Sequence, residues 1–516
     1  MKRDREHDEH EQRGHPAAEN ALSAHPGDAT ARCRAQTTCA DRRGDRRSYG
    51  CDVSARRTQA DEIVIVANRL PVVRADDGSW EVSPGGLVSA LAPIVQAGRG
   101  SWIGWAGTVG TPPRAFDHGG MRLTPIGLSA REIEGFYEGF ANRTLWPLYH
   151  DAVRPPEFRR EWWQSYVETN ERFAELTAKV ASKGATVWVH DYQLHLVPAL
   201  LRALRPDLRI GFFLHIPLPP QELFMQLPWR QQLVEGMLGA DLVGFQRPVA
   251  AQNFLQIARR LVDVVPTRTM IPYQGRTVRV GAFPVSIDFA EFDGIAASPA
   301  TARGAAELRE ALGSPRRILL GVDRLDYTKG IDVRLQAFRE LLESGVTTAG
   351  ETVLVQVATP SRERVTTYRQ LRERVERAVG RINGEFGRLG HPAIHYQHHN
   401  LPREDLCALY VAADVMLVTP LRDGMNLVCK EYVAARHRGG GVLVLSEFAG
   451  AAGELRQALL VNPHDVVGLR ETIARAIALP EGEARRRMRE LRRQVRTHDV
   501  HRFARTFLEA LAEPAA

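Results

Sequence analysis

The chain has 516 residues, more than a single hydrophobic core usually holds, so the sequence predicts at least two domains. Hydrophobic residues make up 44% and charged residues 25%, which is the composition of a folded globular protein rather than a disordered or fibrous one. The chain has 68 Lys and Arg residues and 61 Asp and Glu residues, so positive and negative charges nearly balance. The net charge of +7 therefore does not indicate a nucleic-acid-binding protein.

The five cysteines follow no zinc-binding spacing, and their number is odd. Cys407 and Cys429 lie in apolar contexts, which are typical of buried free thiols in a reducing compartment. No apolar run is long enough to span a membrane, and the charged N-terminus lacks the apolar core of a signal peptide. We therefore expect a cytoplasmic protein with no membrane partner, no metal and no cofactor.

Residues 1–60 differ in composition from the rest of the chain, with one Leu and no Ile, Phe or Trp. Such a segment cannot bury enough apolar surface to offset the entropy that it would lose on ordering. The sequence therefore predicts a disordered extension whose histidines are solvated rather than bound to metal.

From Asp61 onward, runs of apolar and β-branched residues predict buried strands separated by helices. The first strands are expected at residues 62–68, 101–106, 186–190, 209–215, 242–245 and 278–285. An apolar stripe from Phe158 to Val180 predicts one long helix packed on the core. We expect this series to form a domain at residues 61–295.

A second series of strands is expected at residues 318–322, 353–358, 394–398, 415–419 and 442–446. Helices are expected between and after them at residues 333–343, 363–386, 403–412, 425–436 and 466–478. This alternation predicts an α/β protein with two doubly wound, Rossmann-like domains that face a cleft, the second at residues 296–484. The helices of residues 485–516 are expected to pack back on the first domain.

Ligands of such sheets bind beyond the carboxyl ends of the strands, so the residues after each strand are the candidate site residues. Arg69 follows the first strand and can grip a phosphate bidentately. Gly85 and Gly86 would let backbone N–H groups approach an anion, although a simple turn explains them better. Asp191 and His215 also end strands; helix capping explains Asp191 equally well, and a lone His at such a place is usually structural.

Two further groups follow strands of the second series. Arg324 and Lys329 lie between a strand and a helix, where two cations beside helix-terminal N–H groups suit a diphosphate. Their spacing is not that of a Walker phosphate-binding loop. Arg362 places another guanidinium after the next strand.

The segment Leu421–Glu431 carries the strongest signal in the chain. Asp423 and the following glycine form a tight turn into a helix, and this carboxylate has the reach to bind sugar hydroxyls. Glu431 falls about two turns into that helix, where it can accept both hydroxyls of a ribose. The alternative, an N-cap with a solvated glutamate, is less favoured.

A highly specific set of motifs runs in this order from residue 61 to the C-terminus: ANRLP, SPGGL, FANRTLWPLYH, WVHDYQL, FFLHIPLP, DRLDYTKG, TPSRERV, RINGEFG, TPLRDGMNLVCKEYVAA and LVLSEFAGAA. In their order, these motifs resemble those of the trehalose-6-phosphate synthases, retaining glycosyltransferases of family 20 with the two Rossmann-like domains of the GT-B fold.

The resemblance implies transfer of glucose, with retention, from a nucleoside-diphosphate glucose to glucose 6-phosphate, giving α,α-trehalose 6-phosphate. UDP-glucose is the default donor. The residues that it implies for glucose 6-phosphate are Arg69, Tyr137, Trp146, Asp191 and Arg362. Those implied for the nucleotide sugar are Gly85, Gly86, Arg324, Lys329, Leu401, Leu427, Val428, Cys429, Lys430 and Glu431. The implied catalytic residues are His215, Arg324, Lys329 and Asp423, of which His215 and Asp423 would contact the transferred glucose.

Two departures from the family pattern remove no catalytic element: Gln193 stands where many members have His, and Tyr149 where Phe is common. Two rival functions remain. Another GT-B glucosyltransferase would lack the phosphate-binding pair Arg69 and Arg362. A non-catalytic relative that senses sugar phosphates would have lost one of the catalytic residues.

Nucleic-acid binding by the basic stretch of residues 485–496 is a remote third function, because its apolar residues recur at the spacing of an inward helix face. The sequence leaves open whether the donor carries UDP, ADP or GDP. It also leaves open whether the protein is a homo-oligomer.

Deleting residues 1–60 should leave the glucosyl transfer rate and the melting temperature nearly unchanged, because this segment has too few apolar residues to pack on the enzyme. Steady-state assays and thermal melts of the shortened and full chains test this. A melting temperature lowered by several degrees would show that the segment packs on the rest.

Overall fold

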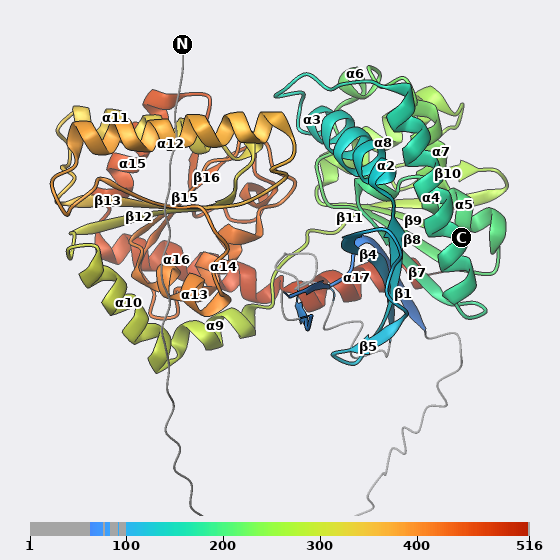
Figure 1. Cartoon of the computed structure of the whole chain (residues 1–516), viewed down its shortest axis with the longest axis horizontal. Coiled ribbons are helices and arrows are strands. Elements are labelled where there is room, and N and C mark those ends of the chain that lie inside the picture. Colours follow the sequence, from blue (N-terminus) through green and yellow to red (C-terminus); the bar gives the residue numbers. More distant parts are fainter. Residues whose placement is uncertain (1–61, 76–77, 83–90, 92–99, 514–516) are drawn as a thin grey trace, which may run out of the picture. The chain divides into compact units, whose positions relative to one another are not determined.

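The computed structural model describes residues 62–75, 78–82, 91 and 100–513. The predictions for residues 1–60 and for Gly85 and Gly86 lie outside the described residues. The described residues form two large sheets with helices on their faces, which confirms the α/β class (Figure 1). In this part of the chain, no helix is long and apolar enough to cross a membrane.

The first sheet has the strand order β10-β11-β9-β8-β7-β1-β4-β6-β5. Its neighbouring strands run parallel, except for the antiparallel edge pairs β10–β11 and β5–β6. The strands are β1 (Ile63–Arg69), β4 (Ser101–Val109), β5 (Phe116–His118), β6 (Met121–Leu128), β7 (Thr186–His190), β8 (Arg209–Leu214), β9 (Leu242–Phe245), β10 (Met270–Tyr273) and β11 (Arg276–Ala282). A separate hairpin pairs β2 (Val72–Arg74) with β3 (Trp80–Val82).

The helices of this half are α2 (Ala130–Glu132), η2 (Ile133–Leu145), α3 (Trp146–Tyr149), α4 (Arg160–Val180), η3 (Tyr192–Leu194), α5 (Val197–Leu204), α6 (Gln221–Phe224), α7 (Arg230–Leu238) and α8 (Pro248–Leu261). The long helix expected from Phe158 is α4, but it begins at Arg160 and Phe158 is exposed. The π-helical turns of η2, a rare geometry often found at functional sites, were not predicted from the sequence.

The second sheet has the order β14-β13-β12-β15-β16-β17, and its strands are all parallel. They are β12 (Arg317–Arg324), β13 (Thr352–Thr359), β14 (Ile394–Gln397), β15 (Val415–Val418), β16 (Val442–Ser446) and β17 (Leu459–Val461). On one face lie α11 (Ile331–Glu343), α12 (Thr366–Phe386) and α15 (Val466–Ala478) (Figure 1). On the other lie α9 (Phe289–Ala297), α10 (Pro299–Ala311), α13 (Arg403–Ala412), α14 (Leu427–Ala435) and α16 (Glu481–Thr497).

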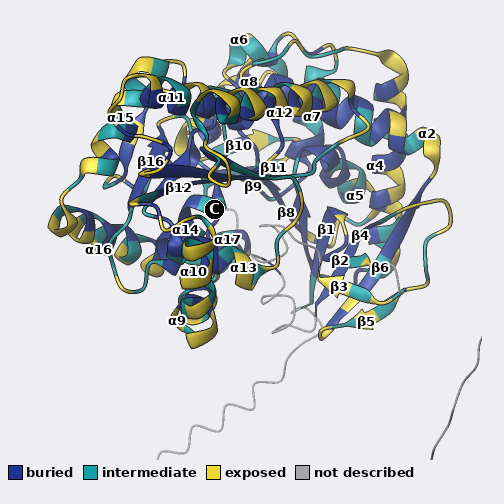
Figure 2. Ribbon diagram, turned by 60° about the vertical axis from the view of Figure 1, so that its left-hand side comes forward, coloured by how far each residue is buried: buried dark blue, intermediate teal, exposed yellow. Residues whose placement is uncertain are grey.

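Both sheets are buried through their centres. The middle of β1 and all of β7, β15 and β16 are shielded from solvent, as expected for parallel strands covered on both faces. Figure 2 shows this pattern, with buried residues along the strands and exposed residues on the outer sides of the helices.

Each sheet has a point where the strand order reverses. In the first sheet the chain adds β4 on one side of β1 and later β7 on the other. In the second it adds β13 on one side of β12 and later β15 on the other. The carboxyl ends of strands at such switch points form a crevice in which ligands bind. Arg69 ends β1, Asp191 follows β7 and Arg324 ends β12, so candidate residues lie at both switch points.

The end of the chain divides between the two halves. Helix α16 packs on α14 and α9 of the second half, so the return to the first half expected from residue 485 begins later. Helix α17 (Val500–Ala512) makes that return and lies against β8 and β9. Phe507 stacks on Trp188 with ring centroids 4.3 Å apart. It occupies the space that Gly211 and Gly244 leave open, because a Cβ on either would lie within 3 Å of its ring.

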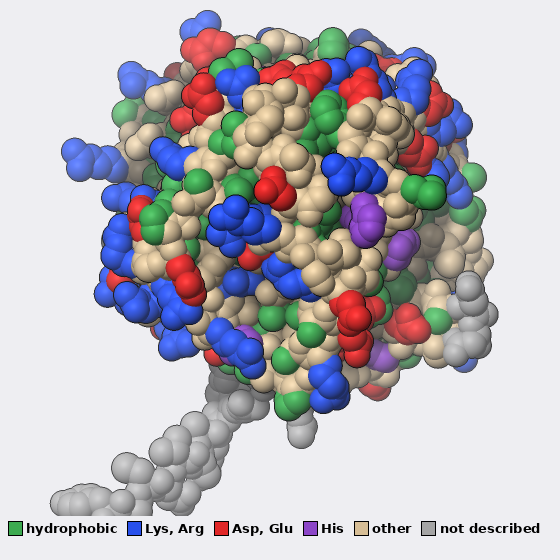
Figure 3. All heavy atoms as spheres, turned by 90° about the vertical axis from the view of Figure 1, so that its left-hand side faces the viewer, with side chains coloured by type: hydrophobic (Ala, Val, Ile, Leu, Met, Phe, Trp, Pro, Cys, Tyr) green, Lys and Arg blue, Asp and Glu red, His purple; other side chains and the backbone are tan. Residues whose placement is uncertain are grey.

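The arginines of α16 are largely paired with acidic residues. The ion pairs include Arg487 with Glu483 at 2.8 Å, Arg493 with Glu490 at 2.7 Å and Arg492 with Asp293 at 2.6 Å. Figure 3, which views the left-hand side of Figure 1, shows Asp and Glu side chains interspersed among Lys and Arg. The apolar side of α16, with Met488, is buried.

Candidate active site

Arg362 joins the two halves at the carboxyl ends of their sheets. Its Nη2 donates to the hydroxyl of Tyr192 at 3.0 Å, and its guanidinium lies 3.8 Å from the centroid of the Trp146 ring. Both contacts cross from the second half to the first. The Tyr192 hydroxyl in turn donates to Asn142 Oδ1 at 2.9 Å. The Arg362 side chain is only 6% exposed, so it needs a buried counter-charge.

Asp326 supplies that charge, and the sequence analysis did not single it out. Its Oδ2 accepts from Arg362 Nη1 at 3.2 Å and from the Tyr368 hydroxyl at 3.0 Å. Its Oδ1 accepts from the backbone and hydroxyl of Thr328, both at 3.0 Å. Burial acts to raise the pKa of Asp326, but the positive charge of Arg362, with that of Arg324, outweighs it and lowers the pKa to about 2. The carboxyl is therefore ionised at neutral pH.

Arg69 and Arg324 join Arg362 in a cationic cluster whose charges act together on Tyr137. The Arg69 guanidinium lies 4.0 Å from the ring centroid of Trp105, a residue that the sequence analysis missed, and 5.8 Å from that of Tyr137. The Arg324 guanidinium lies 5.3 Å from the ring centroid of Trp146.

The pKa of Tyr137 reflects the positive electrostatic field of this cluster. Burial acts to raise its pKa, but the guanidinium groups of Arg362, Arg69 and Arg324 outweigh burial and lower the pKa. Nearby positive charges and a hydrogen bond from Arg69 both favour the charged form of the phenol. The cluster is therefore suited to bind an anion.

His150 also belongs to this region and was missed by the sequence analysis, although it ends the LWPLYH string. It is 1% exposed, its Nδ1 lies 2.7 Å from the Trp146 carbonyl oxygen, and its ring lies against the Trp146 indole at 4.1 Å between centroids. Burial lowers the pKa of His150 to about 4. It is therefore neutral at neutral pH and adds no charge to the cationic cluster.

A second cluster forms around Asp423, after β15. Lys329 Nζ lies 2.6 Å from Asp423 Oδ2, and Asn426 Nδ2 donates to the same oxygen at 3.1 Å. Burial acts to raise the pKa of Asp423, but the Lys329 ammonium outweighs it, so the pKa is lowered and the carboxylate stays ionised. The backbone of Gly424 touches the first half, because a Cβ there would lie 2.3 Å from the His215 carbonyl oxygen.

Asp191 and His215 lie opposite this cluster, on the first half. Asp191 adopts a left-handed backbone with φ 76°, and its Oδ1 accepts from the backbone N–H of His215 at 3.1 Å. Burial raises the pKa of Asp191 to about 6 and lowers that of His215 to about 3. His190 Nδ1 lies 3.0 Å from His215 Nε2, and burial also lowers the pKa of His190, so both rings are neutral.

Helix α14 begins at this site, and its residues divide in their roles. The Asn426 side chain caps the helix by accepting from the Cys429 N–H at 3.0 Å, which leaves the N–H groups of Leu427 and Val428 without a partner inside the helix. Glu431 accepts from the Tyr410 hydroxyl at 2.9 Å, and burial raises its pKa.

The side chains of Cys429 and Lys430 make contacts inside the protein. Cys429 is fully buried, with its Sγ against the Asn426 carbonyl, and the Lys430 ammonium is buried against Glu454. Leu401 lies in the loop between β14 and α13, half-buried.

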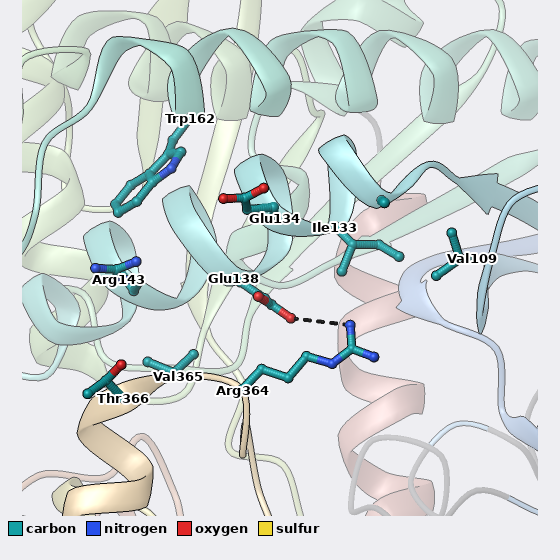
Figure 4. Close-up of a pocket in the computed structure, with 10 residues that line it drawn as sticks. Val109, Ile133, Glu134, Glu138, Arg143, Trp162, Arg364, Val365 and Thr366 are labelled. Atoms are coloured by element: carbon teal, nitrogen blue, oxygen red, sulfur yellow. Dashed lines mark ion pairs between the residues drawn. The ribbon is translucent and has the colours of Figure 1, made fainter.

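A cavity of about 390 Å³ lies between η2 and the start of α12 (Figure 4). Glu138 and Arg364 face each other across it at 3.8 Å. None of the sequence-predicted site residues lines it, and it is separate from the clusters of Arg362 and Asp423. In the part of the chain that the structure describes, no group of three His, Cys, Asp or Glu residues is arranged to hold a metal.

Comparison with known proteins shows extensive similarity. The sequence profile of glycosyltransferase family 20 matches residues 61–513. The trehalose-6-phosphate synthase of Mycolicibacterium smegmatis is 59% identical over 464 residues, which cover 87% of this chain and 92% of that protein. An α,α-trehalose-phosphate synthase (UDP-forming) from Burkholderia xenovorans, solved with glucose 6-phosphate, has a TM-score of 0.82 and 35% identity, covering 88% of this chain and 100% of its own. A structure from E. coli bound with UDP-2-fluoro glucose has a TM-score of 0.81 and 33% identity, covering 88% and 99%.

Replacing Asp191 by Asn should stabilise the ligand-free protein above about pH 6. Because burial raises the pKa of Asp191 to about 6, its contribution to stability is complete below about pH 4 and is lost as the pH rises through 6. Asn still accepts the His215 N–H without a charge. The melting temperature of the variant minus that of wild type should therefore increase between about pH 4 and pH 6 and level off above about pH 7.

Asp207→Asn is the matched control. Its pKa is lowered by hydrogen bonds from Arg205, so the same substitution should destabilise the protein near neutral pH. A melting-temperature difference for Asp191→Asn that is the same at every pH would contradict the prediction.

Proposed function

Because the chain belongs to glycosyltransferase family 20, we infer that it transfers glucose from UDP-glucose to glucose 6-phosphate and so makes trehalose 6-phosphate, and we propose which residues act at each step. The observation that supports this assignment is the Arg362 contact across the two halves. It places an arginine of the second half beside Tyr192 and Trp146 of the first. An acceptor phosphate at this point would bind to both halves at once.

We assign the acceptor phosphate to the cationic cluster of Arg69, Tyr137 and Arg362. Arginine forks bind phosphate bidentately, and the lowered pKa of Tyr137 reflects the positive field that would stabilise a dianion. Trp146 supplies an apolar face beneath Arg362, and its indole Nε1 is buried without a partner. Asp191 would accept a hydrogen bond from a hydroxyl of the acceptor sugar, which also compensates its costly burial.

We assign the donor to the second cluster, to Arg324 of the cationic cluster and to α14. Arg324, Lys329 and the free N–H groups at the start of α14 would bind the diphosphate, aided by Gly85 and Gly86. Asp423, held ionised by Lys329, and neutral His215 would bind hydroxyls of the transferred glucose. Glu431, with its second oxygen free, would bind the ribose, and the backbone at Leu401 the base.

The reaction then needs no protein nucleophile. In the front-face mechanism that we propose, the acceptor hydroxyl attacks the anomeric carbon on the side from which the phosphate leaves. The bond from that carbon to the diphosphate oxygen breaks as the new bond forms, and the hydroxyl proton passes to the departing phosphate. Arg324 and Lys329 stabilise the charge that develops on the diphosphate, an effect worth on the order of 10²–10³ in rate for each preorganised donor.

We also propose that the protein acts in the cytoplasm and binds small molecules rather than nucleic acid. Two observations support this: Cys407 and Cys429 are buried free thiols, and the arginines of α16 are paired with acidic residues.

Replacing Arg324 or Lys329 by Ala should cripple turnover while the protein stays folded. Truncating a cation that binds a buried anion costs about 2–5 kcal/mol, or about 30- to 5,000-fold in kcat/KM. Arg364→Ala is the control, since Arg364 is 76% exposed and lies outside both clusters. Near-normal turnover of a folded Arg324→Ala or Lys329→Ala enzyme would overturn the diphosphate assignment.

The acceptor assignment is tested by a double cycle of enzyme and substrate. Wild type and Arg362→Ala are each assayed with glucose 6-phosphate and with glucose. If Arg362 binds the phosphate, wild type should strongly prefer glucose 6-phosphate in kcat as well as in KM, and the variant should have lost much of that preference. Arg362→Lys should also be impaired, because Lys cannot form the bidentate fork. An equal preference in wild type and Arg362→Ala would mean that Arg362 does not contact the phosphate.

A further inference from the structure

The chain crosses from the first half to the second through residues 283–288, between β11 and α9. Both backbone polar groups of Val285, in the middle of this segment, bond to side chains, one from each half. Its N–H donates to Gln246 Oε1 of the first half at 2.9 Å, and its carbonyl accepts from Lys430 Nζ of the second half at 2.9 Å. Both contacts are buried.

Lys430 is held at this crossing by an unusual degree of burial for a lysine. Its side chain is 1% exposed, and its Nζ also donates to Glu454 Oε1 and Oε2 at 3.3 and 3.1 Å. The ammonium thus bonds the Val285 carbonyl on one side and both oxygens of the Glu454 carboxylate on another. An isolated buried ammonium would be costly, so the Glu454 carboxylate is what allows the charge to remain at the crossing.

Gln246 connects the crossing to the active site. It follows β9, is 4% exposed, and donates from Nε2 to the His215 carbonyl at 3.3 Å. This is the carbonyl that the Gly424 backbone approaches so closely that a Cβ would lie 2.3 Å from it. A continuous set of contacts thus runs from the point where the halves touch, through Gln246, to the segment that joins them, and on to α14.

We propose that Gln246, Lys430 and Glu454 form an interdomain clamp that sets the distance between donor and acceptor, and that they are positioning residues for glucosyl transfer. The proposal rests on the proposed function, in which the donor lies on the second half and the acceptor largely on the first. Two of the clamp residues adjoin residues of the site: Gln246 bonds the His215 carbonyl, and Lys430 precedes Glu431 in α14.

The clamp matters because the reacting atoms come from opposite halves. A misplacement of about 1 Å can slow such a reaction about a hundredfold, and a gap between the halves admits water. Loosening the clamp should therefore slow transfer and let water compete with the acceptor, while leaving binding of UDP to the second half nearly unchanged. General destabilisation would not alter how glucose partitions between acceptor and water.

The test uses the full-length enzyme and three clamp variants. Gln246→Leu removes both hydrogen bonds at similar volume. Gln246→Glu keeps the acceptor for the Val285 N–H and loses the donor to His215. The double variant Lys430→Met with Glu454→Gln removes the ion pair without leaving a lone buried charge.

The matched controls break comparable contacts within one half. Arg309→Met removes an ion pair to Asp414 at 2.8 Å and a hydrogen bond to the Ala412 carbonyl at 2.9 Å, all inside the second half. Asn253→Ala removes a hydrogen bond from an amide to the Leu218 carbonyl at 3.0 Å inside the first half. Neither residue belongs to the site or to the clamp.

For every variant we would measure the melting temperature, UDP affinity by calorimetry, kcat, and the ratio of UDP released to trehalose 6-phosphate formed. Clamp variants should lose at least about tenfold in kcat with UDP affinity within about threefold of wild type, and the ratio should rise above one. Gln246→Glu should be impaired at least as much as Gln246→Leu, because it places an unpaired buried carboxylate oxygen beside the His215 carbonyl oxygen. The controls should keep a ratio of one even where their melting temperature falls as far as that of the clamp variants.

The clamp is overturned if its folded variants keep kcat within about twofold of wild type, or if UDP affinity falls as much as kcat, or if the ratio stays at one. Hydrogen exchange at residues 283–288 gives a readout that does not need activity, and it should accelerate in the clamp variants and not in the controls. If wild type makes no trehalose 6-phosphate, the proposed function fails, and the clamp is then judged by this exchange alone: unchanged exchange in the clamp variants would overturn it.

Discussion

Arg362 carries a full positive charge into a region that water hardly reaches, and most features of the site follow from how that charge is held. The Asp326 carboxylate neutralises this charge by an ion pair, and Thr328 and Tyr368 donate further hydrogen bonds to that carboxylate. With its cost of burial offset, the guanidinium is free to lie against the Trp146 ring and the Tyr192 hydroxyl of the other half. The same group that we assign to the phosphate thus also holds the two halves together.

The charges on the donor side follow a related pattern. Lys329 is paired with Asp423 at 2.6 Å, and Lys430 with Glu454 at 3.1 Å, so each buried cation has a carboxylate beside it. The two pairs differ in what lies around them. The first lies just after β12 and β15, where we assign the donor, and the second lies at the crossing between the halves, where its ammonium also bonds the Val285 carbonyl.

Backbone geometry supports the same division. Asp191, Arg362 and Asn426 all adopt left-handed conformations, with φ of 76°, 49° and 80°, although none is glycine. Such conformations cost on the order of 1–3 kcal/mol each and persist where surrounding contacts enforce them. Here the side-chain contacts of each residue hold it: Asp191 accepts the His215 N–H, Arg362 bonds Asp326, and Asn426 caps α14.

Much of this protein could be predicted from its sequence, because the signals involved are local. The β-branched runs of β1, β12 and β15 predict parallel strands, and the polar residues directly after them, such as Arg69 and Arg324, had to lie at the ligand-binding edge of each sheet. The family motifs added Tyr137 and Trp146, which no periodicity would have indicated.

What the sequence could not predict depends on contacts between residues far apart in the chain. Asp326 looks like a local turn residue until Arg362 is placed beside it, Lys430 looks like a ligand of the nucleotide until its ammonium is found on the Val285 carbonyl, and Gln246 has no local pattern at all. These roles were decided only by the tertiary structure, because a buried charge or amide is defined by the partner that compensates it, and that partner comes from another part of the fold.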